Sequence, residues 1–488
     1  MSVRSAALDS RRFWGWLAAI TIAGAVLRFW HLGQRSLWFD EGVSVGFARL
    51  PWHQMWLAMW EQANMLFYYV GLRGWMFFGD SEFWLRTFSV IPAIASIVLL
   101  ALLGRRYYGS TVGIISAALL SVSVLHVHYS RDVRGYPLLV LLLILSWWFY
   151  IRALRSGRGR DFAWWAVCAT AAIYTHLFAV LIFAAQVVCI GFAPSRYRRI
   201  RWSVLAIASV GAVCLPLVVA GRSGDGQQIS WIPPLSRQTF QLFVYEFTGA
   251  EWTPFFVSLA VFVILLGLFA RTLFREGLSE ETWLMSMPIA GTILPVVLVL
   301  LASIFLEPCF LPRYLIVILP FFLLGLAIAL VRLPRWIAGP LLLIILAGNI
   351  FGLHTYFSEP PWNDYRSATS YIAGHAKPGD ALVIWGTQSR FAVDYYAAKR
   401  PAATSFPVIA YPAPLTVAGI DARPSVDQIN HLSTRFSRVW LLFDFDVPKS
   451  EYPVYAKFFI RRLELQYRDH SLAHFSHVQV LEFSNKTR

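Results

Sequence analysis

Long apolar runs recur along the first 353 residues of the chain, separated by short polar segments. A helix needs about 20 predominantly apolar residues to cross a bilayer. Runs near this length, with ends placed to within a few residues, lie at about 13–31, 85–103, 111–127, 136–151, 162–175, 177–193, 203–220, 253–270, 283–305, 314–331 and 336–353. The pattern therefore predicts a polytopic α-helical membrane protein with about 11 transmembrane helices.

The fifth and sixth runs are short and nearly continuous, with Tyr174-Thr175-His176 between them. One helix of about 31 residues would be longer than the bilayer is thick, because each residue adds about 1.5 Å. Two short spans joined by a tight turn are therefore the better interpretation.

The pattern changes after about residue 354, where Pro360-Pro361 follows the last apolar run. The amphipathic spacing from Asp364 to His375 predicts a helix. Short apolar stretches predict strands at 381–385, 439–443 and 477–483. Alternating helices and strands are typical of an α/β domain. We expect a transmembrane domain with a large first external loop, followed by a small C-terminal α/β extracytoplasmic domain: 1–353, including 32–84, and 354–488.

Composition agrees with a membrane protein. Of the 488 residues 57% are hydrophobic and only 14% are charged, whereas a soluble protein has about 25% charged residues. The net charge of +15 could suggest a nucleic-acid partner. The arginines, however, lie in short clusters between apolar runs and form no single basic face, so we expect no nucleic acid. Three of the four cysteines lie inside apolar runs, which predicts no disulfide framework.

The arginine clusters also predict how the chain is oriented. Cytoplasmic loops of membrane proteins are enriched in Lys and Arg. If the N-terminus is cytoplasmic, every loop predicted to be internal carries arginine: Arg105 and Arg106; Arg152, Arg155, Arg158 and Arg160; Arg196, Arg198, Arg199 and Arg201; Arg271 and Arg275; Arg332 and Arg335. An odd number of spans then places the C-terminal domain outside the cytoplasm.

Asp40 and Glu41 follow the first apolar run directly, behind Trp38-Phe39. Carboxylates beside hydrocarbon are energetically costly unless they are hydrated, paired with a cation or required for function. They could deprotonate an acceptor hydroxyl or hold a divalent cation. Alternatively, Asp40 could cap a helix that starts near Glu41, with both charges favoured by its N-terminal dipole. The two interpretations are compatible.

Arginines also occur on the side predicted to be external. Arg131 and Arg134 lie in a loop of roughly nine residues within 126–136, and a helical turn would place them on one face. Arg313 lies at the external start of the tenth run. A forked guanidinium suits phosphate. The alternatives are ion pairing with Asp132, lipid headgroups, or snorkelling of Arg313 to the interface.

His176, in the turn between the fifth and sixth runs, is either structural or part of a pocket. All these groups are expected on one side of the membrane. Carboxylates for a hydroxyl and arginines for a phosphate, at the lipid boundary, favour a lipid-phosphate substrate.

Six short motifs follow one another between about residues 25 and 335: Leu37-Trp38-Phe39-Asp40-Glu41, Leu66-Phe67-Tyr68-Tyr69, the segment from Phe78 to Arg86, the segment from Tyr129 to Tyr136, Tyr174-Thr175-His176 and Arg313-Tyr314. In this order they resemble motifs of the membrane-embedded C-type glycosyltransferases (the GT-C architecture). The group in question is the glycosyltransferase family 39-like group, the bacterial relatives of dolichyl-phosphate-mannose protein mannosyltransferases. The tail resembles the group only in its opening, 363–380.

The resemblance implies an inverting glycosyltransferase in a bacterial inner membrane. Its partners would be a polyprenyl-phosphate-linked sugar, the lipid bilayer and an envelope acceptor hydroxyl on a lipid, glycan or protein. It implies no cofactor, although an Asp-Glu pair could hold a divalent cation weakly. The implied site comprises Asp40 as base and Glu41 as supporting carboxylate, the donor-phosphate partners Arg131, Arg134 and Arg313, and the pocket residues Tyr314, His176, Asn64 and Tyr68.

One segment departs from the group, which usually has His-Pro-Pro or Pro-Pro before the Leu-Tyr-Tyr-like motif. Here Ala63-Asn64-Met65 stands in that place, so the identities of the sugar and the acceptor stay open.

A transporter or flippase of lipid-linked sugars is the alternative function. It would need charged or broken helices near mid-membrane, whereas these runs are nearly free of charge at their centres. A binding protein acting through its tail would leave the carboxylates and external arginines without a role.

Overall fold

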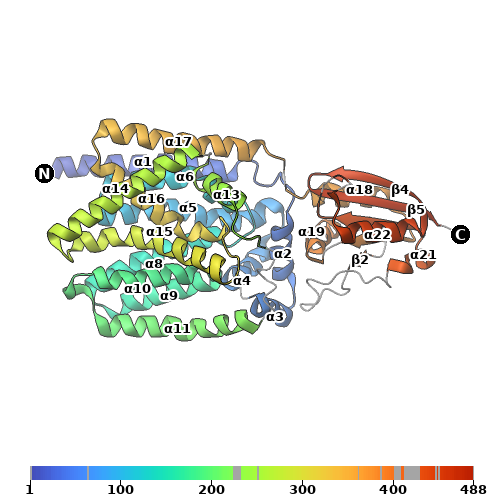
Figure 1. Ribbon diagram of the computed structural model, residues 1–488, viewed down its shortest axis with the longest axis horizontal. Helices are drawn as coiled ribbons and strands as arrows, with labels where there is room; N and C mark the ends of the chain where they lie inside the picture. The colour runs from blue at the N-terminus through green and yellow to red at the C-terminus, as the bar shows by residue number, and fades with distance from the viewer. Residues whose placement is uncertain are drawn as a thin grey trace. The chain divides into compact units, whose positions relative to one another are not determined.

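The computed structural model describes residues 3–62, 65–223, 232–249, 252–360, 362–384, 387–399, 408–410, 429–445, 448 and 451–486. The chain forms two compact units (Figure 1). The first comprises Met1–Trp30, Met59–Gly71 and Arg86–Ser358, and the second comprises His31–Ala58, Leu72–Leu85 and Glu359–Arg488. The expected domains, with the whole first external loop in the transmembrane part, stay a prediction.

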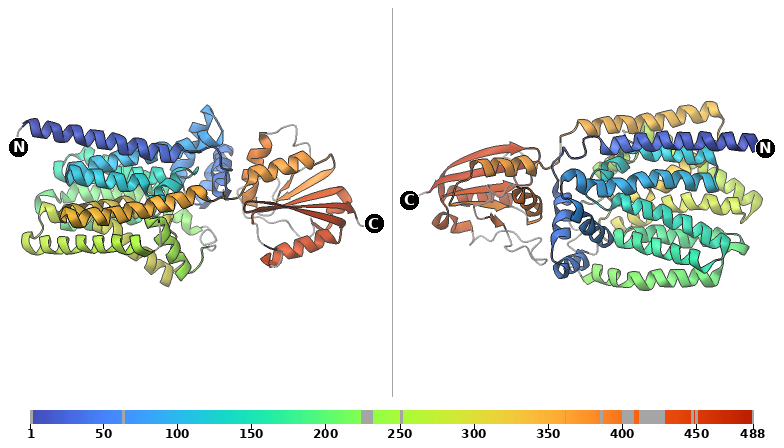
Figure 2. Two further views of the ribbon diagram at one scale, coloured as in Figure 1. Left: turned by 90° about the horizontal axis from the view of Figure 1, so that it is seen from above. Right: turned by 180° about the vertical axis from the view of Figure 1, so that it is seen from behind.

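The first unit is helical, and its long helices run side by side in the views of Figures 1 and 2. Its helices, the first residues of α5 excepted, are α1 (Val3–Phe29), α5 (Glu82–Tyr107), α6 (Ser110–Val122), α7 (Val124–Ser130), α8 (Tyr136–Ser156), α9 (Gly159–Thr175), α10 (Ala179–Phe192), η2 (Ser195–Tyr197), α11 (Ile200–Ser223), α13 (Arg237–Thr248), α14 (Trp252–Glu276), α15 (Glu280–Phe305), η3 (Tyr314–Ile318), α16 (Leu319–Arg332) and α17 (Arg335–Ser358). Two more helices are divided between the units: α3 (Trp52–Gln62) and α4 (Leu66–Trp75).

Each of the eleven predicted runs falls on a helix, so the polytopic helical fold is confirmed. In the described residues, 7 helices are long and apolar enough to cross a membrane, or up to 8 if the bent pair α6–α7 counts as one span. The remaining runs lie on α1, α9 and α10, and the last two have only 17 and 14 residues. The count of eleven spans stays a prediction.

The second unit contains the α/β domain. Its elements are α2 (Phe39–Arg49), η1 (Met76–Phe78), α18 (Tyr365–His375), β1 (Asp380–Ile384), α19 (Thr387–Ala398), β2 (Val408–Ala410), α21 (Leu432–Arg435), β3 (Arg438–Phe443), α22 (Val454–Glu464), β4 (Tyr467–Phe475) and β5 (Val478–Lys486). The strands form one sheet in the order β2-β1-β3-β5-β4. β1 pairs parallel with β2 and β3, whereas β5 pairs antiparallel with β3 and β4.

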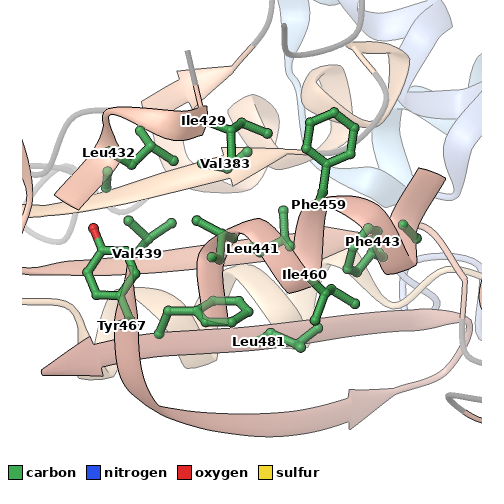
Figure 3. Packing of buried hydrophobic residues seen from close by; sticks show 14 of the residues in the cluster. Val383, Ile429, Leu432, Val439, Leu441, Phe443, Phe459, Ile460, Tyr467 and Leu481 are labelled. Carbon is green, nitrogen blue, oxygen red and sulfur yellow. The ribbon is translucent and has the colours of Figure 1, made fainter. Parts of the chain in front are cut away.

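Side chains alternate across this sheet, as the pleat requires. Val439 and Leu441 of β3 face α22, where they pack with Phe459 in the hydrophobic core (Figure 3). Trp440, between them, contacts Tyr371 of α18, with ring centroids 6.0 Å apart. The domain therefore has helices on both faces of its sheet. The predicted strands and the helix before them are confirmed, although Trp385 lies outside the described residues.

Candidate active site

Five side chains of the first unit form a row of cations and rings. The guanidinium of Arg134 lies 5.8 Å from the centre of the Tyr136 ring, and this ring lies 5.7 Å from His176. His176 lies 5.1 Å from the Tyr314 ring, over which the guanidinium of Arg313 lies at 5.6 Å. Segments from far apart in the sequence thus bring together four predicted site residues and Tyr136.

His176 is a neutral hydrogen-bond donor at the centre of this row. It is buried at the C-terminal end of α9, and burial, with Arg134 and Arg313, lowers the pKa of His176 to about 3. The backbone N–H of Phe178 donates to Nδ1 at 3.3 Å, which leaves the ring proton on Nε2. Among the described residues, neither this Nε2 nor the buried hydroxyl of Tyr136 has a hydrogen-bond partner.

Glu246, which the sequence motifs did not single out, adds a carboxylate that interacts electrostatically with Arg313. It lies on α13, and burial raises the pKa of Glu246 to about 7, although Arg313 acts in the opposite direction. Its Oε2 is enclosed without a hydrogen-bond partner among the described residues. The only sequence signal was a single carboxylate in the amphipathic stretch after the seventh apolar run.

The loop that carries Arg134 is tightly packed. The hydroxyl of Tyr68, a predicted pocket residue, lies 2.9 Å from Oγ of Ser89, which in turn contacts the Arg134 carbonyl oxygen at 3.0 Å. A Cβ atom on Gly135 would lie only 3.1 Å from Cβ of Tyr68 and 3.3 Å from Cγ2 of Thr175. Tyr68 therefore supports the backbone of this loop, and glycine allows the loop to pass between its neighbours.

Arg131 and Arg134 do not lie on one helical face, contrary to the prediction. Helix α7 continues to Ser130, so the loop is only residues 131–135. Nη1 of Arg131 donates to the carbonyl oxygens of Leu27, Arg28 and Trp30 at the end of α1. Carbonyl groups in the last turn of a helix lack a partner within that helix, and Arg131 therefore caps α1. Its role in holding a phosphate stays a prediction.

A broken helix sets the position of this loop. The predicted third run bends by 58° between α6 and α7, at Ser123. The buried guanidinium of Arg28 lies 3.0 Å from the Ser121 carbonyl oxygen, 3.3 Å from that of Leu120 and 2.7 Å from Nδ1 of His126. Arg28 thus satisfies carbonyls that the break releases.

We expect Arg28→Met to destabilise the protein by about 2–4 kcal/mol, because a buried polar group left unsatisfied costs about 1–3 kcal/mol and Arg28 serves more than one. Thermal unfolding of the purified protein in detergent measures this loss. Arg271→Met, at an exposed position of α14, is the matched control and should change little. Equal unfolding temperatures for the two variants would contradict the assigned role.

The predicted carboxylates, Asp40 and Glu41, belong to the second unit. Helix α2 begins at Phe39, and Trp38 is its N-cap residue. Glu41 is fully buried, and its Oε2 accepts the backbone N–H of Trp38 at 3.1 Å. The expectation that Asp40 caps a helix starting near Glu41 is therefore wrong. Glu41 makes the capping hydrogen bond, whereas Asp40 lies partly exposed in the first turn.

Asn64, the remaining predicted pocket residue, lies outside the described residues. Within the described ranges, no group of three or more His, Cys, Asp or Glu side chains could hold a metal ion.

The first unit offers hydrogen-bond donors and cations, a set suited to an anion. The second unit offers a carboxylate at the first turn of a helix.

Known proteins resemble this chain in sequence over part of its length and in fold over nearly all of it. The sequence model of the family described as dolichyl-phosphate-mannose-protein mannosyltransferase matches residues 64–220. No curated protein sequence matches significantly. Among solved structures, apo ArnT from Cupriavidus metallidurans is 12% identical with a TM-score of 0.62, and the match covers 96% of this chain and 97% of ArnT.

Two further structures contain a lipid phosphate. ArnT from the same organism, bound to undecaprenyl phosphate, is 12% identical with a TM-score of 0.55, covering 96% of this chain and 98% of that one. The oligosaccharyltransferase AglB from Archaeoglobus fulgidus, in complex with an inhibitory peptide and a dolichol-phosphate, is 10% identical with a TM-score of 0.56, covering 88% and 69%. By sequence over 64–220 and by fold over nearly its whole length, the chain is similar to the C-type membrane glycosyltransferases of the family 39-like group, as its motifs predicted.

Proposed function

We propose that this multi-pass membrane protein is an inverting glycosyltransferase that uses a polyprenyl-phosphate sugar as donor. Its acceptor would be an envelope hydroxyl on the outer face of a bacterial inner membrane, with the N-terminus in the cytoplasm. The observation that carries the proposal is the buried, neutral His176, whose ring lies 5.7 Å from that of Tyr136 and 5.1 Å from that of Tyr314, each of which lies beside a guanidinium. Such a set of donors suits a phosphate group attached to a lipid.

The chemistry follows from these groups. The acceptor oxygen forms a bond to C1 of the sugar while the bond between C1 and the phosphate oxygen breaks. The acceptor proton passes to the carboxylate of Asp40 as general base. Negative charge develops on the departing polyprenyl phosphate, and Arg134, Arg313 and His176 stabilise it. The solved structures with undecaprenyl phosphate and dolichol-phosphate support a lipid-linked donor.

Comparing a deletion strain with its parent tests the proposal. The strain should accumulate one polyprenyl-phosphate sugar and lose the corresponding substituent from an envelope glycan, lipid or protein, as mass spectrometry would show. A strain whose lipid-linked sugars and envelope glycans both match those of the parent would contradict it. A flippase would instead leave the sugar on the lipid and change only the leaflet in which it is found.

Donor binding should weaken as pH rises through about 7. The pKa of Glu246 is raised to about 7, so the carboxyl is neutral below this pH and negative above it. A phosphodiester donor keeps its charge across this range, and ionised Glu246 would repel it and compete for Arg313. We expect the affinity at pH 8 to be about tenfold lower than at pH 6, because two like charges about 10 Å apart repel each other by about 1.7 kcal/mol at an effective dielectric constant of about 20.

Glu246→Gln should remove this pH dependence, whereas Glu307→Gln, at an exposed position upstream of Arg313, should retain it. Titrating the variants with the donor at several pH values measures the effect. A Glu246→Gln variant with the pH profile of the parent would contradict the assignment.

A further inference from the structure

Helix α2 packs against α19 of the C-terminal domain at very short range. Ala392 and Phe391 of α19 face Gly42 and Gly46, which are one helical turn apart on α2. A Cβ atom on Gly42 would lie 2.9 Å from the backbone nitrogen of Ala392. A Cβ atom on Gly46 would overlap the ring of Phe391, which is buried and packs edge-on to Phe47 with centroids 5.7 Å apart. Only glycine at these positions allows so close an approach.

Helices α18 and α19 also hold the residues that lead into α2. The hydroxyl of Tyr396 accepts the backbone N–H of Leu37 at 2.7 Å, three residues before Asp40. The backbone N–H of Arg366, on α18, donates to Oγ of Ser36 at 3.2 Å. The Arg366 guanidinium also donates to the carbonyl oxygens of residues 33–35 and to Glu82. The backbone that leads into α2 is therefore fixed by the tail.

The other end of α2 is held as well. Arg49, its last residue, forms an ion pair with Asp80 at 2.9 Å, and its guanidinium lies 5.2 Å from the Tyr395 ring. The hydroxyl of Tyr395 donates to the Asp80 carbonyl oxygen at 2.7 Å. Nζ of Lys399 donates to the same carbonyl at 3.1 Å. Contacts thus extend over the whole length of α2, from the residue before its N-cap to its C-terminal arginine.

From these contacts we infer that α19 positions α2, and through it the carboxylate of Asp40, for the transfer reaction. The C-terminal domain is then part of the catalytic apparatus rather than a separate module. Phe391 and Tyr396 are positioning residues that act through α2. The inference rests on the proposed function, because it takes Asp40 as the base. A displacement of about 1 Å at a reacting group can reduce turnover by about a hundredfold.

Paired substitutions at the helix crossing test this inference. Gly46→Ala should lower kcat at least about tenfold and leave KM for the donor unchanged, because only the base is displaced. Adding Phe391→Ala removes the ring atoms that the new methyl group meets, so the double variant should recover activity relative to Gly46→Ala. Gly374→Ala, on α18, is the matched control, since a Cβ atom there would meet nothing within 4 Å.

Tyr396→Phe provides a milder second variant in case the double variant does not fold. It removes the acceptor for the Leu37 N–H, so hydrogen exchange in the segment 36–46 should become faster while the sheet strands keep their protection. We expect kcat to fall about three- to tenfold with KM unchanged.

Two results would overturn the inference. One is unchanged exchange of this segment in both Gly46→Ala and Tyr396→Phe. The other is faster exchange with transfer at the parental rate. A parental protein that transfers no sugar would contradict the proposed function instead, and the exchange data would still show whether α19 holds α2.

Discussion

Asp40→Asn should give a protein that folds, inserts and binds donor normally but transfers sugar at least about a hundredfold more slowly. An acceptor hydroxyl is a poor nucleophile near neutral pH, and a positioned general base contributes about 10²–10⁴-fold. The substitution keeps the shape of the side chain and removes its basicity. The N-terminal cap of α2 should survive, because the capping oxygen belongs to Glu41 and not to Asp40. Single-turnover measurements with purified protein would show the loss in the chemical step.

Variants of Glu41 provide the comparison. Glu41→Gln retains an oxygen that can accept the Trp38 N–H, so it should cost much less activity than Asp40→Asn. Glu41→Ala should lower the free energy of unfolding by about 0.5–2 kcal/mol through loss of the cap. If purified Asp40→Asn transfers sugar at a near-normal rate, Asp40 is not the base and Glu41 becomes the next candidate.

Arg134→Met and Arg313→Met should each raise KM for the donor about 10- to 100-fold, because a hydrogen bond to a charged group contributes about 1.5–3 kcal/mol. The corresponding Lys variants should show a smaller increase, since a point charge replaces the fork of the guanidinium. The measurement is the dependence of the transfer rate on donor concentration, with thermal unfolding to confirm that each variant is folded.

Arg131 separates phosphate binding from structural support. Its Nη1 donates to the carbonyl oxygens at the end of α1. Arg131→Lys should therefore lower the unfolding temperature and leave the donor affinity nearly unchanged. Normal donor affinity in all four variants of Arg134 and Arg313 would contradict the phosphate site. If Arg131→Lys lowers the donor affinity more than Arg134→Lys does, Arg131 binds the phosphate as well.

The sequence predicted the helices well because apolar runs of bilayer length have few alternatives to a helix. It also predicted the tail helix from Asp364, which is indeed the residue that caps α18. The break at Ser123 was not predictable, because the run is apolar on both sides of it. The structure shows why the break is tolerated: Arg28, almost a hundred residues earlier, reaches the released carbonyls.

Long-range contacts account for the other differences. Arg131 and Arg134 are three residues apart, and local spacing alone placed them on one face. They diverge because α1 supplies acceptors for Arg131, whereas the guanidinium of Arg134 lies over the Tyr136 ring. Glu246 has no motif, and only folding brings it to Arg313. Likewise, the sequence alone does not show why Gly42 and Gly46 are glycine. The reason is the close packing of α19 on them.

The most direct test of the proposed glycosyl transfer is mass spectrometry of proteoliposomes that contain the purified protein, lipid-linked sugars and an envelope extract as acceptor. The account predicts that one polyprenyl-phosphate sugar disappears, that free polyprenyl phosphate appears with an acceptor heavier by one sugar, and that Asp40→Asn abolishes both changes. A donor that stays intact, or that crosses the bilayer with its sugar still attached, would contradict it.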